Sequence, residues 1–233
     1  MKPPLISCVV PVFNGERYLS ETLDSILAQT YRPLEIVVVD DGSTDQTADV
    51  IASYSDKVHY FKQANAGVPA ARNLGISAAA GAFIAFLDAD DLWHPEKLER
   101  QMACFKARPE LEICLTHVQN FWGSKSETQL NRPNNRPLVK PIPGYVTQAL
   151  LTKRTTFETV GSFDTSFGHA YKTDWFLRAS ARGCAMELLT DVLVYRRLHH
   201  ANMSRSFSAA ARDEYLNLLK ANLDRRRSER STL

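Results

Sequence analysis

The chain has 233 residues, of which 44% are hydrophobic and 23% are charged, close to the averages for globular proteins. This length and composition predict one domain, or one domain with an appendage, and exclude intrinsic disorder, a collagen-like chain and a small disulfide-rich scaffold. The formal net charge is +2, from 28 Lys+Arg and 26 Asp+Glu, so charge gives no support to a nucleic-acid-binding function.

The cysteines and the hydropathy of the chain bear on its compartment. Cys8, Cys104, Cys114 and Cys184 are far apart and form no CxxC pair, so a zinc site is not expected, and free thiols fit a reducing environment. No stretch approaches the roughly 18 apolar residues that a membrane-spanning helix needs. Residues 1–4 lead directly into an apolar run, without the cleavage site of a signal peptide. We therefore expect a cytoplasmic protein.

The first hundred residues alternate apolar runs with helical patterns. Continuous apolar runs predict strands buried on both faces, whereas apolar residues at intervals of three and four predict helices. The expected strands are 5–10, 34–39, 58–61 and 82–87, and the expected helices are 16–29, 46–54, 69–79 and one that begins near Pro95. This alternation is typical of βαβ units around a mainly parallel sheet, which binds ligands beyond the carboxyl ends of its strands.

The second half is less regular. A polar segment over 123–144 carries four prolines and predicts a long loop that is either functional or disordered. The remaining patterns predict strands over 112–118 and 192–196, helices over 144–151, 174–181 and 209–223, and a basic tail over 225–230.

The clearest chemical signal is the segment 87–91, with the sequence LDADD, at the end of an apolar strand. Two carboxylates that flank one small residue offer hard oxygen ligands suited to Mg²⁺ or Mn²⁺, and such a cation would bridge to the diphosphate of a bound nucleotide. The plainer interpretation is a solvated acidic turn or a helix cap, because a three-residue pattern recurs by chance.

A second acidic segment, 39–43 with the sequence VDDGS, also follows a buried strand. A carboxylate at this place can accept hydrogen bonds from the N–H of a base or from a ribose hydroxyl. The alternative is an Asx turn that caps the next helix.

Taken together, these segments resemble the large inverting family 2 of glycosyltransferases, which have the GT-A fold. The resemblance is strong over residues 5–100, is traceable to about Ser204, and rests on the order and spacing of VVPVFN at 9–14, LDSILAQTYRP at 23–33, EIVVVDDGSTD at 35–45, NAG at 65–67, ARN at 71–73 and FLDADD at 86–91. It implies an α/β fold of the GT-A type: a Rossmann-like, mainly parallel sheet flanked by helices, with an irregular acceptor-side second half. The implied domain covers residues 1–205, with a nucleotide-sugar-binding half at 1–100 and an acceptor half at 101–205. A C-terminal helix and basic tail follow at 206–233.

The resemblance also implies roles for individual residues of the first half. Asp41 would bind the base, Asp88 would contact the ribose, and Asp90 would ligate Mn²⁺ or Mg²⁺. The residues implied to lie around the nucleotide-sugar are Pro11, Phe13, Glu16, Asp41, Asn65, Arg72, Asp88 and Ala89. The chemistry agrees in kind, because Phe13 offers a flat apolar surface for a base and Arg72 offers a fork of donors for anionic oxygens.

In the second half, the segment 160–164 resembles the acceptor side of the family. Thr173 and Asp174 stand where the family usually has Glu-Asp before a tryptophan, which implies that Asp174 is the catalytic base and that Thr173 replaces the first acid. An aspartate with an ordinary pKa of about 3.9 is ionised at pH 7 and can accept a proton. Without the resemblance, Asp174 is more simply the N-cap of a helix.

His199 lies in a closing segment, 195–204, that also resembles the family. There a histidine can complete the metal shell, and a neutral imidazole is a good ligand for a first-row metal such as Mn²⁺. The alternative is an exposed loop histidine.

The implied activity is that of a metal-dependent inverting, hexosyltransferase-type glycosyltransferase. It would move a sugar from a nucleotide-diphosphate sugar, with a UDP-sugar expected, to an acceptor hydroxyl in cell-surface polysaccharide or glycolipid synthesis. Asp174 would take the acceptor proton, and the metal would offset charge on the leaving diphosphate. The expected partners are this donor and a carbohydrate or lipid-linked acceptor, without nucleic acid. The basic tail is most simply a solvated helix end, and contact of its arginines with anionic lipid at the inner membrane surface is the alternative.

Three other functions share some of these sequence features. A sugar nucleotidyltransferase would share the sheet and the acidic site, but the first strand is followed by PVFNG at 11–15 rather than by a glycine-rich basic loop. A Rossmann dehydrogenase is excluded, since no GxGxxG follows that strand. A catalytically degenerate relative that binds a nucleotide or a partner stays open because of Thr173.

Overall fold

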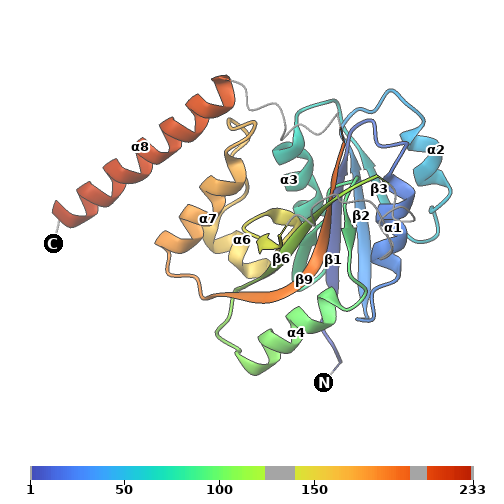
Figure 1. Ribbon diagram of the computed structural model, residues 1–233, viewed down its shortest axis with the longest axis horizontal. Helices are drawn as coiled ribbons and strands as arrows, with labels where there is room; N and C mark the ends of the chain where they lie inside the picture. Colours follow the sequence, from blue (N-terminus) through green and yellow to red (C-terminus); the bar gives the residue numbers. More distant parts are fainter. Residues whose placement is uncertain (1, 124–139, 200–208, 232–233) are drawn as a thin grey trace.

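The computed structural model describes residues 2–123, 140–199 and 209–231, with side chains from 211 to 223 in the last segment. In these residues nine strands form one mixed sheet in the order β3-β2-β1-β4-β8-β6-β9-β5, with β7 paired to β6 (Figure 1). The strands are β1 (Ile6–Val12), β2 (Leu34–Asp40), β3 (His59–Lys62), β4 (Phe83–Phe86), β5 (Leu92–Trp93), β6 (Ile113–Trp122), β7 (Ile142–Pro143), β8 (Leu151–Lys153) and β9 (Met186–Leu198).

Helices cover both faces of this sheet. The helices are α1 (Leu19–Leu27), α2 (Thr47–Ala52), α3 (Val68–Ala78), α4 (Lys97–Ala107), the 3₁₀ helix η1 (Thr147–Ala149), α6 (Arg154–Val160), α7 (Tyr171–Ala181) and α8 (Ala209–Ser231). Buried side chains of α1, α2 and α4 share one hydrophobic core, and those of α3, α6 and α7 share the other. The predicted α/β architecture is therefore confirmed as three layers (Figure 1).

Burial on both faces explains the uninterrupted apolar run of β1. Cys8 and Val10 point into the core under α1, whereas Val9 points into the core under α3. Helix α3 packs very closely here, because a Cβ added at Gly75 would lie 2.3 Å from a methyl carbon of Val9. Every side chain of β1 is thus apolar or small enough for a fully covered strand.

The parallel half of the sheet brings three loops to one edge. Strands β3, β2, β1 and β4 are all parallel. Strand β1 lies between β2, which follows it in the chain, and β4, which pairs with its opposite edge. Such a reversal of strand order creates a crevice at the carboxyl ends of the strands. Segments 13–16, 41–45 and 87–91 follow β1, β2 and β4, so the predicted nucleotide-binding segments share this edge.

The second half differs from the sequence prediction in several places. The predicted helix over 144–151 is wrong, because η1 is followed at once by β8, which pairs antiparallel with both β4 and β6. Its apolar residues are buried in the sheet, so tertiary packing overrides the helical pattern. Strand β9 is longer than predicted and pairs in parallel with β6. The sequence does not predict helix α6 or strand β5. Short antiparallel pairs of β5, β7 and β8 add to the parallel ladders and make the sheet mixed.

Helix α8 extends away from the body of the molecule (Figure 1). Its Glu214 carboxylate accepts the N–H groups of residues 168–170, at 2.8 to 3.1 Å, and so fixes the loop before α7. The predicted helix over 209–223 is confirmed and continues to Ser231. The arginine side chains of the tail lie outside the described residues. None of the helices that the structure describes is both long enough and apolar enough to cross a membrane.

Candidate functional site

The acidic segment after β4 forms a tightly connected cluster. Asp91 is buried, with 1% of its surface exposed, and its carboxylate accepts the N–H of Arg197 at 2.8 Å and Nε2 of Gln148 at 3.0 Å. The same Gln148 amide also donates to Asp88. Asp90 Oδ2 lies 2.9 Å from Nε2 of His199. The carboxylates of this segment are therefore held by hydrogen bonds to other parts of the chain, unlike those of a solvated turn.

Burial and crowding alter the protonation of this cluster. Burial, followed by the charge of Asp88, raises the pKa of Asp90. Burial raises the pKa of Asp91 well above its usual range, with the charges of Asp90 and Asp88 adding to the effect. Because neighbouring carboxylates resist ionising together, a bound cation would favour the ionised forms and release protons.

Asp90 and His199, the two predicted metal ligands, lie together. Asp90 Oδ2 and His199 Nε2 are 2.9 Å apart, within hydrogen-bonding distance, so both side chains would be available to one cation. Carboxylate oxygen and imidazole nitrogen also suit Mn²⁺. In the described residues no group of three or more His, Cys, Asp or Glu side chains gathers as a metal centre.

Arg72, predicted to hold base or phosphate, is brought to the same cluster. It is fully buried in α3 and pairs with Asp88 and with the hydroxyl of Tyr171. Burial alone would lower its pKa, but Tyr171 and Asp88 together raise it. Its Nε is buried without a hydrogen-bond partner among the described residues. The site thus retains one buried donor that the protein itself does not satisfy.

Arg197 belongs to the predicted closing segment 195–204, but its role in the site is not predicted from the sequence. Its guanidinium is fully buried between the rings of Tyr18 and Phe121, at 4.5 and 4.8 Å from their centroids. Nε donates to the backbone carbonyl of Asp90 at 2.9 Å, and Nη2 pairs with Glu21 at 3.0 Å. Arg197 therefore fixes the backbone of the acidic segment to α1 and β9 through charge-assisted hydrogen bonds and cation–π contacts.

Gln148 and Trp93 contribute contacts to the cluster that the sequence does not predict. The backbone carbonyl of Gln148 accepts the indole N–H of Trp93 at 2.9 Å, which holds the backbone of η1, while the side-chain amide donates to Asp88 and Asp91. The ammonium of Lys97 lies 4.2 Å from the Trp93 ring. No local sequence pattern marks Gln148, because its role depends on η1 passing the end of β4.

Asp41 and Asn65 lie on the loops after β2 and β3. Asp41 is 4% exposed and accepts Nε2 of Gln63 at 2.7 Å and the N–H groups of Ala66 and Gly67 at 2.8 Å each. Its carboxylate thus shapes the loop that carries the exposed side chain of Asn65. Asp41 acts on that loop in this structure, and its contact with a base stays a prediction.

The loop after β1 presents Phe13 to solvent. The Phe13 side chain is 51% exposed, whereas Pro11 is buried within β1. Glu16 accepts the N–H of Gln46 at 2.9 Å and donates its own N–H to Asp45 at 3.1 Å. The Phe13 ring is thus available as a flat surface, and Glu16 joins this loop to the one after β2. Ala89, within the acidic segment, is partly buried.

Asp174 has a different environment from the acidic cluster. Helix α7 begins at Tyr171, so Asp174 lies within the helix and the alternative prediction of an N-cap is wrong. Its Oδ2 accepts Nε of Arg178 at 2.8 Å. Arg178 also donates to the carbonyls of Val160 and Ser162, at 2.6 and 2.8 Å. This ion pair holds the Asp174 carboxylate near the turn that follows α6.

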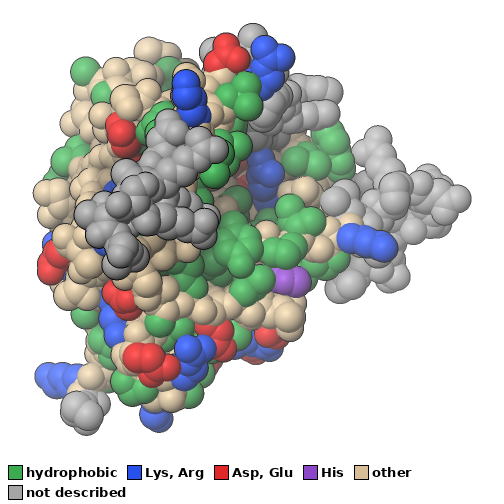
Figure 2. All heavy atoms as spheres, turned by 90° about the vertical axis from the view of Figure 1, so that its left-hand side faces the viewer, with side chains coloured by type: hydrophobic (Ala, Val, Ile, Leu, Met, Phe, Trp, Pro, Cys, Tyr) green, Lys and Arg blue, Asp and Glu red, His purple; other side chains and the backbone are tan. Residues whose placement is uncertain are grey.

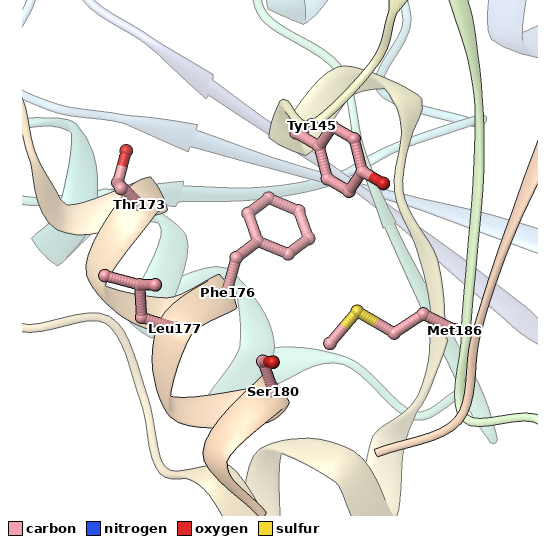
Figure 3. A pocket seen from close by; sticks show the side chains of 6 residues that line it. All are labelled: Tyr145, Thr173, Phe176, Leu177, Ser180 and Met186. Atoms are coloured by element: carbon pink, nitrogen blue, oxygen red, sulfur yellow. The ribbon is translucent and has the colours of Figure 1, made fainter. Parts of the chain in front are cut away.

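Thr173 lines an apolar pocket of about 400 Å³ beside α7. Figure 3 shows it with the other lining side chains, Tyr145, Phe176, Leu177, Ser180 and Met186. The rings of Tyr145 and Phe176 meet edge to face at 6.2 Å. Figure 2 views the molecule from the left-hand side of Figure 1 and shows hydrophobic side chains gathered near the middle of that face. An acid at position 173 would thus face a mostly apolar wall.

Comparison with known sequences identifies the family. The sequence profile described as Glycosyl transferase family 2 matches residues 7–173, a range that ends one residue before Asp174. An uncharacterized glycosyltransferase of Rickettsia typhi is 33% identical over 218 residues, which cover 87% of this chain and 67% of the relative. One from Nostoc is 31% identical over 224 residues, covering 90% of this chain and 69% of the relative.

Solved structures agree on the fold. Staphylococcus aureus TarS 1-349 in complex with UDP-GlcNAc has a TM-score of 0.71 and 22% identity, and the match covers 88% of this chain and 61% of that one. The mannosyltransferase PcManGT from Pyrobaculum calidifontis, in complex with GDP-Man and Mn²⁺, has a TM-score of 0.68 and 20% identity, covering 86% and 59%. The chain thus spans about 60% of the length of these structures.

The profile match covers most of the chain, and the curved mixed sheet with its flanking helices is that of the GT-A glycosyltransferases. The predicted family and fold are confirmed: the chain belongs to glycosyl transferase family 2.

Proposed function

We propose that the chain is a metal-dependent, inverting glycosyltransferase that uses a nucleotide-diphosphate sugar, with a UDP-sugar as the first candidate. One observation carries the proposal: the cluster of Asp88, Asp90 and His199 lies at the carboxyl edge of the parallel strands, beside the buried Arg72. Ligands of open α/β sheets bind at this edge. Relatives in fold were solved with UDP-GlcNAc and with GDP-Man plus Mn²⁺, which supports a donor of this class.

The donor would lie across the loops at the ends of β1, β2 and β4. Phe13 would stack on the base, Asp41 and Asn65 would flank it, and Asp88 would accept a ribose hydroxyl. A divalent cation held by Asp90 and His199 would supply charge stabilisation for the leaving diphosphate. The orphaned Nε of Arg72 supports a further acceptor oxygen in this place.

Asp174 is the proposed base that takes the proton from the acceptor hydroxyl. Attack from the face opposite the diphosphate would invert the anomeric carbon in one step, so a single carboxylate suffices. This role requires Asp174 to serve the acceptor while Arg178 holds its Oδ2, which leaves Oδ1 as the proton acceptor.

The acceptor and the location complete the proposal. We propose a carbohydrate or lipid-linked acceptor in the synthesis of cell-surface polysaccharide or glycolipid, handled on the cytoplasmic side. The support for a peripheral membrane contact is the sequence of the tail, in which four arginines occur between 225 and 230. Each basic residue near an anionic surface contributes about 1 kcal/mol.

A second candidate function, nucleotide binding without sugar transfer, is favoured by one observation. The Asp174 carboxylate is paired with Arg178 rather than with any member of the acidic cluster. A protein of this kind would bind the donor at the same edge of the sheet but leave it intact.

Calorimetric titration tests donor binding and the metal site. UDP, GDP, dTDP and CDP are each titrated with and without Mn²⁺ into wild type, Asp90→Ala, His199→Ala and the control Asp56→Ala, which changes an exposed loop aspartate. We expect one nucleotide to bind in a Mn²⁺-dependent way, with the dependence lost in the first two variants only. No binding of any nucleotide to folded wild type would refute the proposed function.

A product assay then separates the two candidate functions. Mass spectrometry of UDP-GlcNAc and GDP-Man incubated with wild type and Mn²⁺ should reveal free UDP or GDP from hydrolysis or transfer, and Asp174→Asn should slow its release by about 100-fold or more. Tight binding without any release of UDP or GDP would instead establish the binding-only candidate.

A further inference from the structure

Lys172, on the first turn of α7, lies beside Tyr171, the residue of that helix that bonds to Arg72 in the acidic cluster. Its ammonium lies 5.6 Å from the centroid of the Tyr171 ring, and the guanidinium of Arg72 lies 5.3 Å from the same centroid. Arg72 in turn pairs with Asp88. The catalytic base predicted from the sequence, Asp174, lies two residues further along the helix, and its carboxylate pairs with Arg178.

The charge of Lys172 has no direct partner in the part of the chain that the structure describes. Among the described residues no carboxylate lies within ion-pair distance of its ammonium. The charge of Arg72 and, less strongly, that of Arg196 disfavour the ammonium form, whereas the charges of Asp88 and Asp91 favour it from further away. Both acids are already engaged, Asp88 by Arg72 and both by Gln148. Lys172 is also partly buried, and burial lowers its pKa. An ammonium ion in such a place is costly unless an anion binds there.

We propose that Lys172 binds the diphosphate of the nucleotide donor. The inference rests on the proposed function, since it assumes that the donor occupies the edge of the sheet marked by Asp88 and Asp90. A diphosphate between the ribose contact and the metal ligands would lie beside the Lys172 ammonium and the Arg72 guanidinium. A compact ammonium with three rotatable donors suits phosphate oxygens. Lys172 is then a donor-binding residue, and α7 contributes a cation to the donor site.

Paired titrations of UDP and uridine, both in Mn²⁺, isolate the contact with phosphate. In Lys172→Met the UDP affinity should fall about tenfold or more, because a charge-assisted hydrogen bond is lost. Uridine affinity should stay at the wild-type value, since uridine has no phosphate. Lys172→Arg keeps the charge and should bind UDP within about threefold of wild type. Lys106→Met, which changes an exposed lysine of α4, is the matched control and should resemble wild type.

The outcomes separate this inference from the proposed function. Unchanged UDP affinity in Lys172→Met, or an equal loss for UDP and uridine, would overturn the role of Lys172 while leaving donor binding intact. Failure of wild type to bind UDP or GDP would overturn the proposed function and the role of Lys172 with it. If GDP binds wild type more tightly than UDP, the same comparison uses GDP and guanosine. Circular dichroism checks that each variant is folded.

Discussion

Lys97 is a buried lysine whose replacement should change how stability depends on pH. Its side chain is fully buried, and its Nζ donates to Gln101 at 2.9 Å and lies over the Trp93 ring. Burial lowers the pKa of Lys97 to about 7 from a usual value of 10.5. The neutral amine is therefore favoured in the folded protein far more than in the unfolded chain.

The size of the effect follows from these two values. Between pH 7 and 10.5 the unfolded chain holds a proton on Lys97 that the folded protein gives up, so the free energy of unfolding rises with pH. A shift of this size corresponds to about 5 kcal/mol when fully expressed. Over the range from pH 7 to pH 8.5, it contributes a rise of about 1.5 kcal/mol. Above pH 8.5 other groups, including cysteine thiols of the unfolded chain, also titrate.

Urea unfolding at pH 7.0, 7.5, 8.0 and 8.5 measures this slope for wild type, Lys97→Met and Lys106→Met. The difference in unfolding free energy between wild type and Lys97→Met should change by about 1.5 kcal/mol across the range, in favour of wild type at the higher pH. Lys106→Met replaces an exposed lysine of the same helix and should keep the wild-type slope. Parallel pH profiles of wild type and Lys97→Met would refute the reasoning.

Three further substitutions test the packing that positions the site. Arg197→Met should lower the free energy of unfolding by about 3 kcal/mol in urea titrations, because it leaves Glu21 and the Asp90 carbonyl without their buried partner. A decrease in the free energy of unfolding of less than about 1 kcal/mol would contradict this role. Gly75→Ala should lower the thermal midpoint, with a cost of about 2 kcal/mol or more, because its Cβ would meet the Val9 methyl at 2.3 Å; an unchanged midpoint would show that α3 can move. Asp41→Ala should cost about 2 kcal/mol and speed amide exchange at residues 66 and 67, which lose their acceptor; unchanged exchange there would exclude this anchoring.

The first half of the fold could be predicted because its local and tertiary preferences agree. Strand β1 is buried on both faces, so its apolar run has one interpretation. The acidic segments after β2 and β4 could be located for the same reason, since a turn after a buried parallel strand lies at the ligand-binding edge. The pairing of Asp90 with His199 was likewise expected, although 109 residues separate them.

The second half could not be predicted because tertiary contacts decide it. Residues 147–151 have a helical pattern, yet β8 fills the space between β4 and β6, and pairing with two strands outweighs helix propensity.

The sequence by itself determined the family, the α/β class and the acidic segments that mark the candidate donor site. The tertiary structure alone decided which side chains complete that site. Arg197 and Gln148 reach the acidic cluster from β9 and η1, and no local spacing encodes such contacts. On α7, Lys172 and Asp174 are two residues apart, so their side chains lie on different sides of the helix. Lys172 and Arg72 lie 5.6 and 5.3 Å from the centroid of the Tyr171 ring, whereas Asp174 pairs with Arg178.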